Sequence, residues 1–161
     1  MKTFITFALA IAPLLFAQAS PAPAPSVVIT TAGAFFALSV PDLAASAAWY
    51  EQKLGLARVA QGGRMDRLAG YVVLEGGGLI VELMKHDDSV RPAAKSPELI
   101  QGFSKAGALV RDFDRTVATL RARGVEMVMG PYPPRETMRA NVVFKDNAGN
   151  LIQLFGDYAR K

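Results

Sequence analysis

The chain of 161 residues contains an internal repeat. The segment FFALSVPDLAASAAWYEQKLG, at residues 35–55, aligns with KAGALVRDFDRTVATLRARG, at residues 105–124, at an offset of 70 positions. Asp42 then matches Asp112, and a later pair of apolar segments, GLIVEL and NLIQLF, aligns at nearly the same offset. A repeat of this kind means that one supersecondary unit occurs twice, so we expect a fold built from two similar halves.

Each half has the same predicted order of elements. A short apolar strand leads to Asp42 or Asp112, which stand where a helix N-cap belongs, and an amphipathic helix follows. Gly55 and Gly124 follow the last apolar turn and predict the helix ends. Three segments of strand character come next, at 57–61, 71–74 and 79–85 in the first half and at 126–129, 141–145 and 151–155 in the second. The pattern predicts an α+β fold of two βαβββ modules in tandem.

One helix covers only one face of each predicted sheet. The free faces need to meet each other or a second chain, so either a self-contained monomer or a homodimer satisfies the pattern. We expect the mixed sheets to form a cupped cavity, which is a natural place for a small-molecule ligand.

The N-terminal residues differ in character from the repeat. Residues 1–19 combine a lone Lys2, an apolar run and Ala-Gln-Ala, which is typical of a secretory signal peptide cleaved after Ala19. The apolar run is short for a membrane span, which favours cleavage over retention as an anchor. The predicted organisation is a signal peptide at 1–19, a Pro/Ala-rich spacer at 20–32, a domain at 33–157 and a tail at 158–161. Within the domain we expect module one at 33–86, a linker at 87–103 with a helical turn near 97–101, and module two at 104–157.

The composition of the chain excludes some classes of function. The chain has no cysteine, so no disulfide stabilises it and no thiol does its chemistry. Its formal charge of +4 falls to +3 without Lys2, which is weak support for nucleic-acid binding, and no second candidate for a membrane helix is found. We therefore expect an exported protein, periplasmic or extracellular, that has a small-molecule partner and neither a nucleic-acid nor a membrane partner after cleavage.

Two segments carry a family resemblance. VPDLAASAAWYEQKLGL, at 40–56, resembles the first helix of the vicinal-oxygen-chelate superfamily, which includes glyoxalase I, extradiol dioxygenases, fosfomycin-resistance enzymes and bleomycin-binding proteins. FKDNAGNLIQLF, at 144–155, resembles the last hairpin of that family. The resemblance spans residues 33–157 and implies the fold, whereas the superfamily hosts many activities.

The resemblance also implies positions for a metal centre, with one ligand from each of four strands. Carried across, these positions are Phe35, Glu82, Lys105 and Gln153. Only Glu82 is an ordinary ligand, so we expect no divalent metal and no other cofactor. We hypothesise instead that the Lys105 ammonium takes the place of the metal and pairs with Glu82; the alternative is that Lys105 extends to water.

The resemblance and the strand pattern together suggest a ligand pocket. Its predicted residues are Phe35, Tyr71, Glu82, Met84, Lys105, Phe144, Gln153 and Phe155. Glu82 and Lys105 are also the candidate catalytic residues, since a lysine beside a carboxylate can transfer protons. We interpret His86, the sole histidine, as a solvated residue at a strand end rather than as a displaced metal ligand or a proton shuttle near the cavity mouth. Loop arginines such as Arg64 and Arg139 are expected to be solvated or to meet an anionic ligand.

Three functions remain open at this point. The first is a metal-independent, small-molecule binding protein that sequesters its ligand. The second is a lyase, isomerase or dioxygenase-type enzyme that acts through Glu82 and Lys105 or through an atypical metal site. The third is an interaction module whose pocket is filled by its own side chains.

Overall fold

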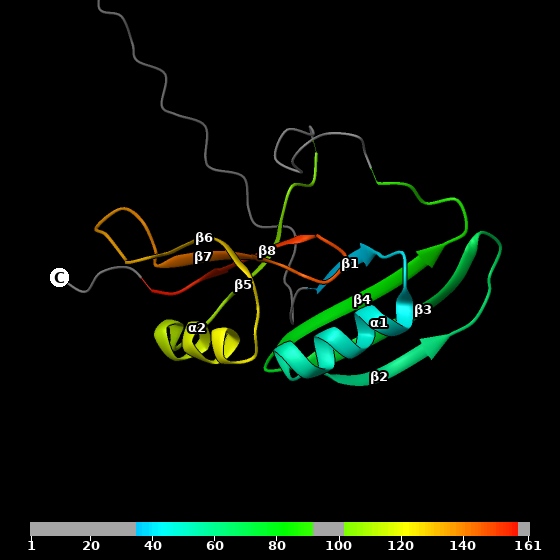
Figure 1. The fold of residues 1–161 in the computed structure, drawn as a ribbon, viewed down its shortest axis with the longest axis horizontal. Helices are drawn as coiled ribbons and strands as arrows, with labels where there is room; N and C mark the ends of the chain where they lie inside the picture. The colour runs from blue at the N-terminus through cyan, green and yellow to red at the C-terminus, as the bar shows by residue number, and fades with distance from the viewer. Residues whose placement is uncertain (1–34, 92–101, 158–161) are drawn as a thin grey trace, which may run out of the picture. The chain divides into compact units, whose positions relative to one another are not determined.

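Module one is a four-stranded sheet with one helical segment beside it (Figure 1). The computed structural model describes residues 35–91 and 102–157, all within the compact unit Ala32–Lys161. The elements of module one are β1 (Phe35–Ser39), α1 (Leu43–Trp49), the π-helical turn η1 (Tyr50–Leu54), β2 (Ala57–Gly62), β3 (Leu68–Gly76) and β4 (Leu79–His86). The strand order is β1-β4-β3-β2, with β1 parallel to β4 and the other neighbours antiparallel.

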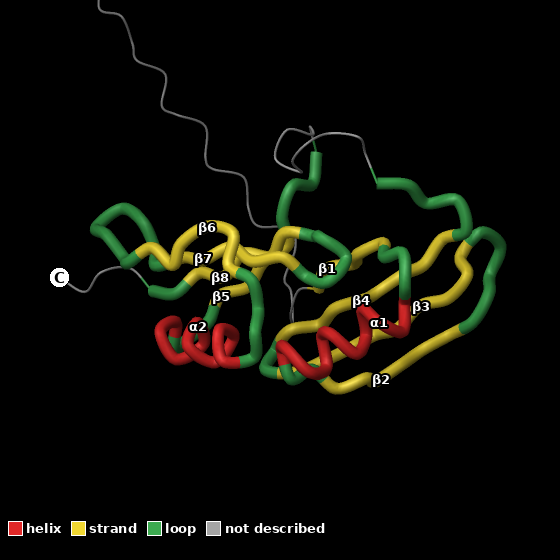
Figure 2. Tube along the Cα trace, viewed as in Figure 1, coloured by secondary structure: helices red, strands yellow, loops and turns green. Residues whose placement is uncertain are grey.

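Module two repeats this plan. Its elements are β5 (Ala106–Leu109), α2 (Phe113–Ala122), β6 (Met127–Tyr132), β7 (Asn141–Lys145) and β8 (Leu151–Phe155), with strand order β5-β8-β7-β6. β5 runs parallel to β8, as β1 does to β4. Figure 2 shows α1 beside the strands of module one and α2 beside those of module two. The predicted pair of βαβββ modules is confirmed, whereas the predicted signal peptide, spacer, tail and helical turn at 97–101 lie outside the described residues.

The helices begin and end where the sequence predicts. Asp42 accepts a hydrogen bond from the Ala45 backbone at 2.9 Å, and Asp112 accepts one from Arg115 at 3.1 Å. Both contacts satisfy an amide that has no partner within its own helix. Gly55 and Gly124 adopt positive φ angles of 73° and 71° after the last helical turns, a conformation that glycine reaches without steric cost.

The two faces of the module-one sheet differ in burial along β4. In β4, Val81 and Leu83 are fully buried and belong to the hydrophobic core, while Glu82 and Met84 alternate with them and are half-buried. Since successive side chains of a strand point to opposite faces, Glu82 lies on the face away from the core. No helix among the described residues is long and apolar enough to cross a membrane.

Module two requires a glycine at position 107, because the backbones of β5 and β8 approach each other closely there. Gly107 pairs with Gln153, and a Cβ at this position would lie 2.6 Å from the Gln153 carbonyl oxygen. The Gly107→Ala substitution should therefore lower the free energy of unfolding by about 2 kcal/mol, because strand β5 has to shift. Urea denaturation followed by circular dichroism measures this loss. The control is Ala37→Gly at the matching register of module one, where Ala37 pairs with Glu82; an unchanged stability of Gly107→Ala would contradict the prediction.

Candidate functional site

The free face of module one carries four of the predicted pocket residues. Glu82 lies between Ala37 on β1 and Val73 on β3 in the sheet register. Tyr71 pairs with Met84 one row away, and Phe35 pairs with Ile80 in the row on the other side. Phe35 is 64% exposed, whereas the other three are half-buried. These residues surround one carboxylate with apolar and aromatic side chains.

The free face of module two carries Gln153 and Phe155. Gln153 lies between Gly107 and Val143, and its amide donates a hydrogen bond to the Asn141 side chain at 3.5 Å. Phe155 pairs with Asn141 and is half-buried. The half-buried Lys105 directly precedes β5.

Phe144 lies apart from the other predicted pocket residues. It pairs with Ile152, so it shares the face of the sheet that is turned toward the core, and it is fully buried. Its ring stacks on the indole of Trp49, with ring centroids 6.4 Å apart. Phe144 therefore packs between the modules, on the opposite face of the sheet from Gln153 and Phe155.

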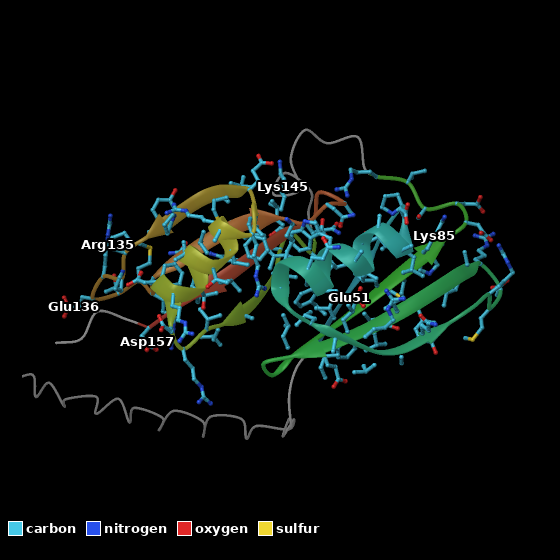
Figure 3. All side chains as sticks on the ribbon, turned by 60° about the horizontal axis from the view of Figure 1, so that its bottom comes forward. Glu51, Lys85, Arg135, Glu136, Lys145 and Asp157 are labelled. Carbon is cyan, nitrogen blue, oxygen red and sulfur yellow. The ribbon has the colours of Figure 1, made fainter. Side chains whose placement is uncertain are left out.

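The hypothesised Glu82–Lys105 pair is not formed. The ion pairs of the described residues include Arg58–Glu51, Arg64–Asp87 and Arg139–Asp157 (Glu51 and Asp157 are labelled in Figure 3). No side-chain hydrogen bond or ion pair between described residues involves the Glu82 carboxylate or the Lys105 ammonium. In this part of the chain the carboxylate therefore has no cationic partner.

The residues that the resemblance assigns to the family's metal positions do not fit a divalent cation. A phenyl ring and an ammonium offer no lone pair to a metal, and Gln153 provides only a neutral amide. His86 lies at the end of β4, paired with Leu68, rather than beside Glu82 in the register. Within residues 35–91 and 102–157, no three His, Asp or Glu side chains converge in a way that could hold a metal ion. No reaction step is therefore assigned to a metal.

A buried polar contact that sequence reasoning missed joins the two modules. The Tyr50 hydroxyl donates to Asp146 Oδ2 at 3.1 Å, and both residues are buried. Asp146 also accepts from the backbone amides of Ala148 and Asn150, at 3.0 and 2.7 Å, and from the Asn150 side chain at 2.9 Å. Burial raises the pKa of the Tyr50 hydroxyl, and the Asp146 charge and hydrogen bond add to this effect. The phenol therefore remains a donor, and it supplies a buried carboxylate with one of its four hydrogen bonds.

Sequence reasoning also missed two cavities. One has a volume of about 600 Å³ and lies among η1, the β3–β4 turn, α2 and the face of module two that carries Phe144. The other, of about 460 Å³, lies at the start of α1 and the end of β2, and Tyr71 lines it. Apart from Phe144, the larger cavity includes none of the predicted pocket residues. The sequence contains no local motif for it, because its walls come from segments far apart in the chain.

Comparison with solved structures shows the same fold in several bacterial proteins. A glyoxylase/bleomycin resistance protein/dioxygenase domain from Frankia sp. EAN1pec superposes with a TM-score of 0.65 at 20% identity, covering 83% of this chain and 96% of that one. TnmS3, an antibiotic binding protein from Streptomyces sp. CB03234, gives 0.59 at 19% identity, with 81% and 98% covered. The fosfomycin resistance protein FosX from Listeria monocytogenes, solved with Mn(II) and a dihydroxypropylphosphonic acid, gives 0.54 at 18%, with 78% and 90% covered.

Sequence comparison points to the same group. No curated protein matches the chain. The sequence profile of the glyoxalase/bleomycin resistance protein/dioxygenase superfamily matches residues 34–154, which include all the strands and helices described above apart from the last residue of β8. The chain belongs to the glyoxalase/bleomycin resistance protein/dioxygenase superfamily.

Proposed function

We propose that this protein is an exported small-molecule binding protein that works without a metal. The observation that carries the proposal is the composition of the free faces. Glu82 is the one ordinary metal ligand among the four positions that the family uses, and Phe35, Tyr71 and Met84 surround it on the same face. Such a surface favours a flat or apolar molecule over a metal-chelated substrate.

A structural neighbour supports binding as the activity. TnmS3 is described as an antibiotic binding protein, and it shares this fold over most of its length. The sequence pattern of residues 1–19 supports export, because a charged start, an apolar run and Ala-Gln-Ala are what a signal peptidase recognises.

Enzymatic action through Glu82 and Lys105 has less support. These residues belong to different modules, and no hydrogen bond or ion pair connects them in the described part of the chain. A general acid–base pair has to share a proton path within hydrogen-bond reach, or through one water.

Metal analysis of the protein recovered from the periplasm of an expressing bacterium tests the proposal. We expect an intact mass that corresponds to residues 20–161, substoichiometric nickel, zinc, iron and manganese, and a melting temperature that EDTA leaves unchanged. A thermal-shift screen of planar aromatic compounds should then raise the melting temperature in proportion to the logarithm of ligand concentration. Stoichiometric metal, or a melting temperature that EDTA lowers, would contradict metal-free binding, and recovery of the full-length mass would contradict cleavage.

A further inference from the structure

The larger cavity has a positively charged rim. Three cationic side chains line it: Lys53 from η1, and Arg115 and Arg123 from α2 and its C-terminal end. No aspartate or glutamate is among the described residues that line this cavity. Because charges of one sign at the mouth of an apolar cavity raise the local potential, the rim favours an anion.

The floor of the cavity is apolar. Leu54, Leu120, Ile152 and Leu154 line it together with Phe144, and Leu120, Ile152 and Phe144 are almost fully buried. The volume of about 600 Å³ lies within the range of small-molecule sites in proteins. A ligand that fills this space has to combine an apolar body with an anionic group.

Two of the three cations have positions held by reciprocal contacts between the modules. The Lys53 ammonium donates to the backbone carbonyl of Arg123, and the Arg123 guanidinium donates to the carbonyl of Lys53 at 3.0 Å. Each side chain thereby caps the C-terminal end of the other helical segment, where a cation is favourable. The contacts keep two like charges close together at the rim, and an anionic ligand would relieve their repulsion.

The third cation is available for a ligand. Within residues 35–91 and 102–157, no hydrogen bond or ion pair uses the Arg115 guanidinium. An arginine fork matches a carboxylate or phosphate with two parallel hydrogen bonds. Arg115 is therefore the group with which an anion at this rim would form new contacts.

A local irregularity of the backbone lies at the same place. α1 does not end as an α-helix but continues as the π-helical turn η1, and the wall residues Lys53 and Leu54 belong to this turn. π-helical turns are rare, and they often occur at functional sites.

We propose that this cavity binds a small amphipathic anion, an aliphatic carboxylate whose head meets Arg115, Lys53 and Arg123 and whose chain lies over the apolar floor. The site is separate from the surface that carries Glu82. Phe144, Ile152 and Leu154 lie on the opposite face of the module-two sheet from Gln153 and Phe155. The proposal therefore does not depend on the proposed function.

Titration calorimetry with decanoate, decyltrimethylammonium and butyrate tests the site. Decanoate should bind with one-to-one stoichiometry, whereas the cation of equal chain length and the short carboxylate should bind at least tenfold more weakly. Decanoate should also change the fluorescence of Trp49, the sole tryptophan, because its ring stacks on the wall residue Phe144. Equal binding of decanoate and decyltrimethylammonium would overturn the proposal, since it would show apolar adsorption without recognition of charge.

The Arg115→Glu variant locates the binding. It should weaken decanoate binding by roughly tenfold, because an attraction at a partly exposed site becomes a repulsion. Arg121→Glu is the matched control, because Arg121 is an exposed arginine on the same helix and is not among the described residues that line the cavity. The assignment would be overturned if both substitutions weakened decanoate binding equally, or if neither substitution weakened it. If the Arg115→Glu variant does not fold, Arg115→Gln takes its place. The effect of these variants on decanoate binding depends neither on metal content nor on a ligand at the Glu82 surface. The proposed anion site and the proposed function can therefore fail independently of each other.

Discussion

Replacing Phe144 with alanine should lower the free energy of unfolding by about 4 kcal/mol, because truncating a buried aromatic ring loses its burial and leaves a cavity. The side chain is fully buried in the core and stacks on Trp49 of the other module. The loss therefore combines packing within module two and packing between the modules. Urea denaturation followed by circular dichroism, with Trp49 fluorescence as a second probe, measures it.

Phe155→Ala is the matched control for this prediction. Phe155 has the same side chain in the neighbouring strand, but it lies on the free face and is half-buried. Its truncation should cost less than half as much, because the ring is partly in water in the folded state. Equal losses for the two variants would show that the free face is packed as tightly as the core, which would favour a pocket filled by its own side chains.

Replacing Asp146 with alanine should lower the free energy of unfolding by about 3 kcal/mol. The carboxylate is 5% exposed and accepts four hydrogen bonds, one of them from the fully buried Tyr50 hydroxyl in the other module. Its removal leaves the fully buried Tyr50 hydroxyl without a partner and takes the acceptor from three part-buried donors of the β7–β8 turn, and an unsatisfied buried polar group is costly. A thermal melt should show a midpoint lower by roughly 10 °C.

Two further variants separate the contributions to this loss. Asp87→Ala removes a carboxylate that forms an exposed ion pair with Arg64, so its melting midpoint should stay near that of the parent protein. Tyr50→Phe should cost about 1 kcal/mol, and its effect should largely vanish in the Asp146→Ala background because the two residues share one hydrogen bond. Additive effects of Tyr50→Phe and Asp146→Ala would contradict the coupling.

The helices and the order of elements along the chain could be predicted from the sequence, because caps, turns and apolar runs are local signals. Asp42 and Asp112 cap the helices with side chains that reach amides three residues away, and Gly55 and Gly124 take the positive φ that ends them. The strand β4 was also predicted from the sequence, because an apolar run that contains a single carboxylate, Glu82, follows a glycine-rich turn.

The face of the sheet on which Phe144 lies could not be predicted from local signals. Asn141, Val142, Val143 and Phe144 are all buried, so β7 shows no alternation between apolar and polar residues that would tell its two faces apart. The register with β8 decides the matter, because Phe144 pairs with Ile152 and Val143 with Gln153. A strand without alternating polarity leaves its faces undefined until a neighbour is paired with it.

The candidate site, too, was predicted from the sequence only in part. The sequence alone predicted two βαβββ modules, since a repeat and its caps are encoded within short segments. The family resemblance then assigned Phe35, Glu82, Lys105 and Gln153 to the positions where that family holds a metal. Only the tertiary structure decided that Glu82 and Lys105 form no pair, that Tyr50 meets Asp146 across 96 residues of chain, and that Lys53, Arg115 and Arg123 surround one cavity. Such contacts depend on how two separately encoded modules pack against each other, and packing between distant segments leaves no periodic signal in the chain.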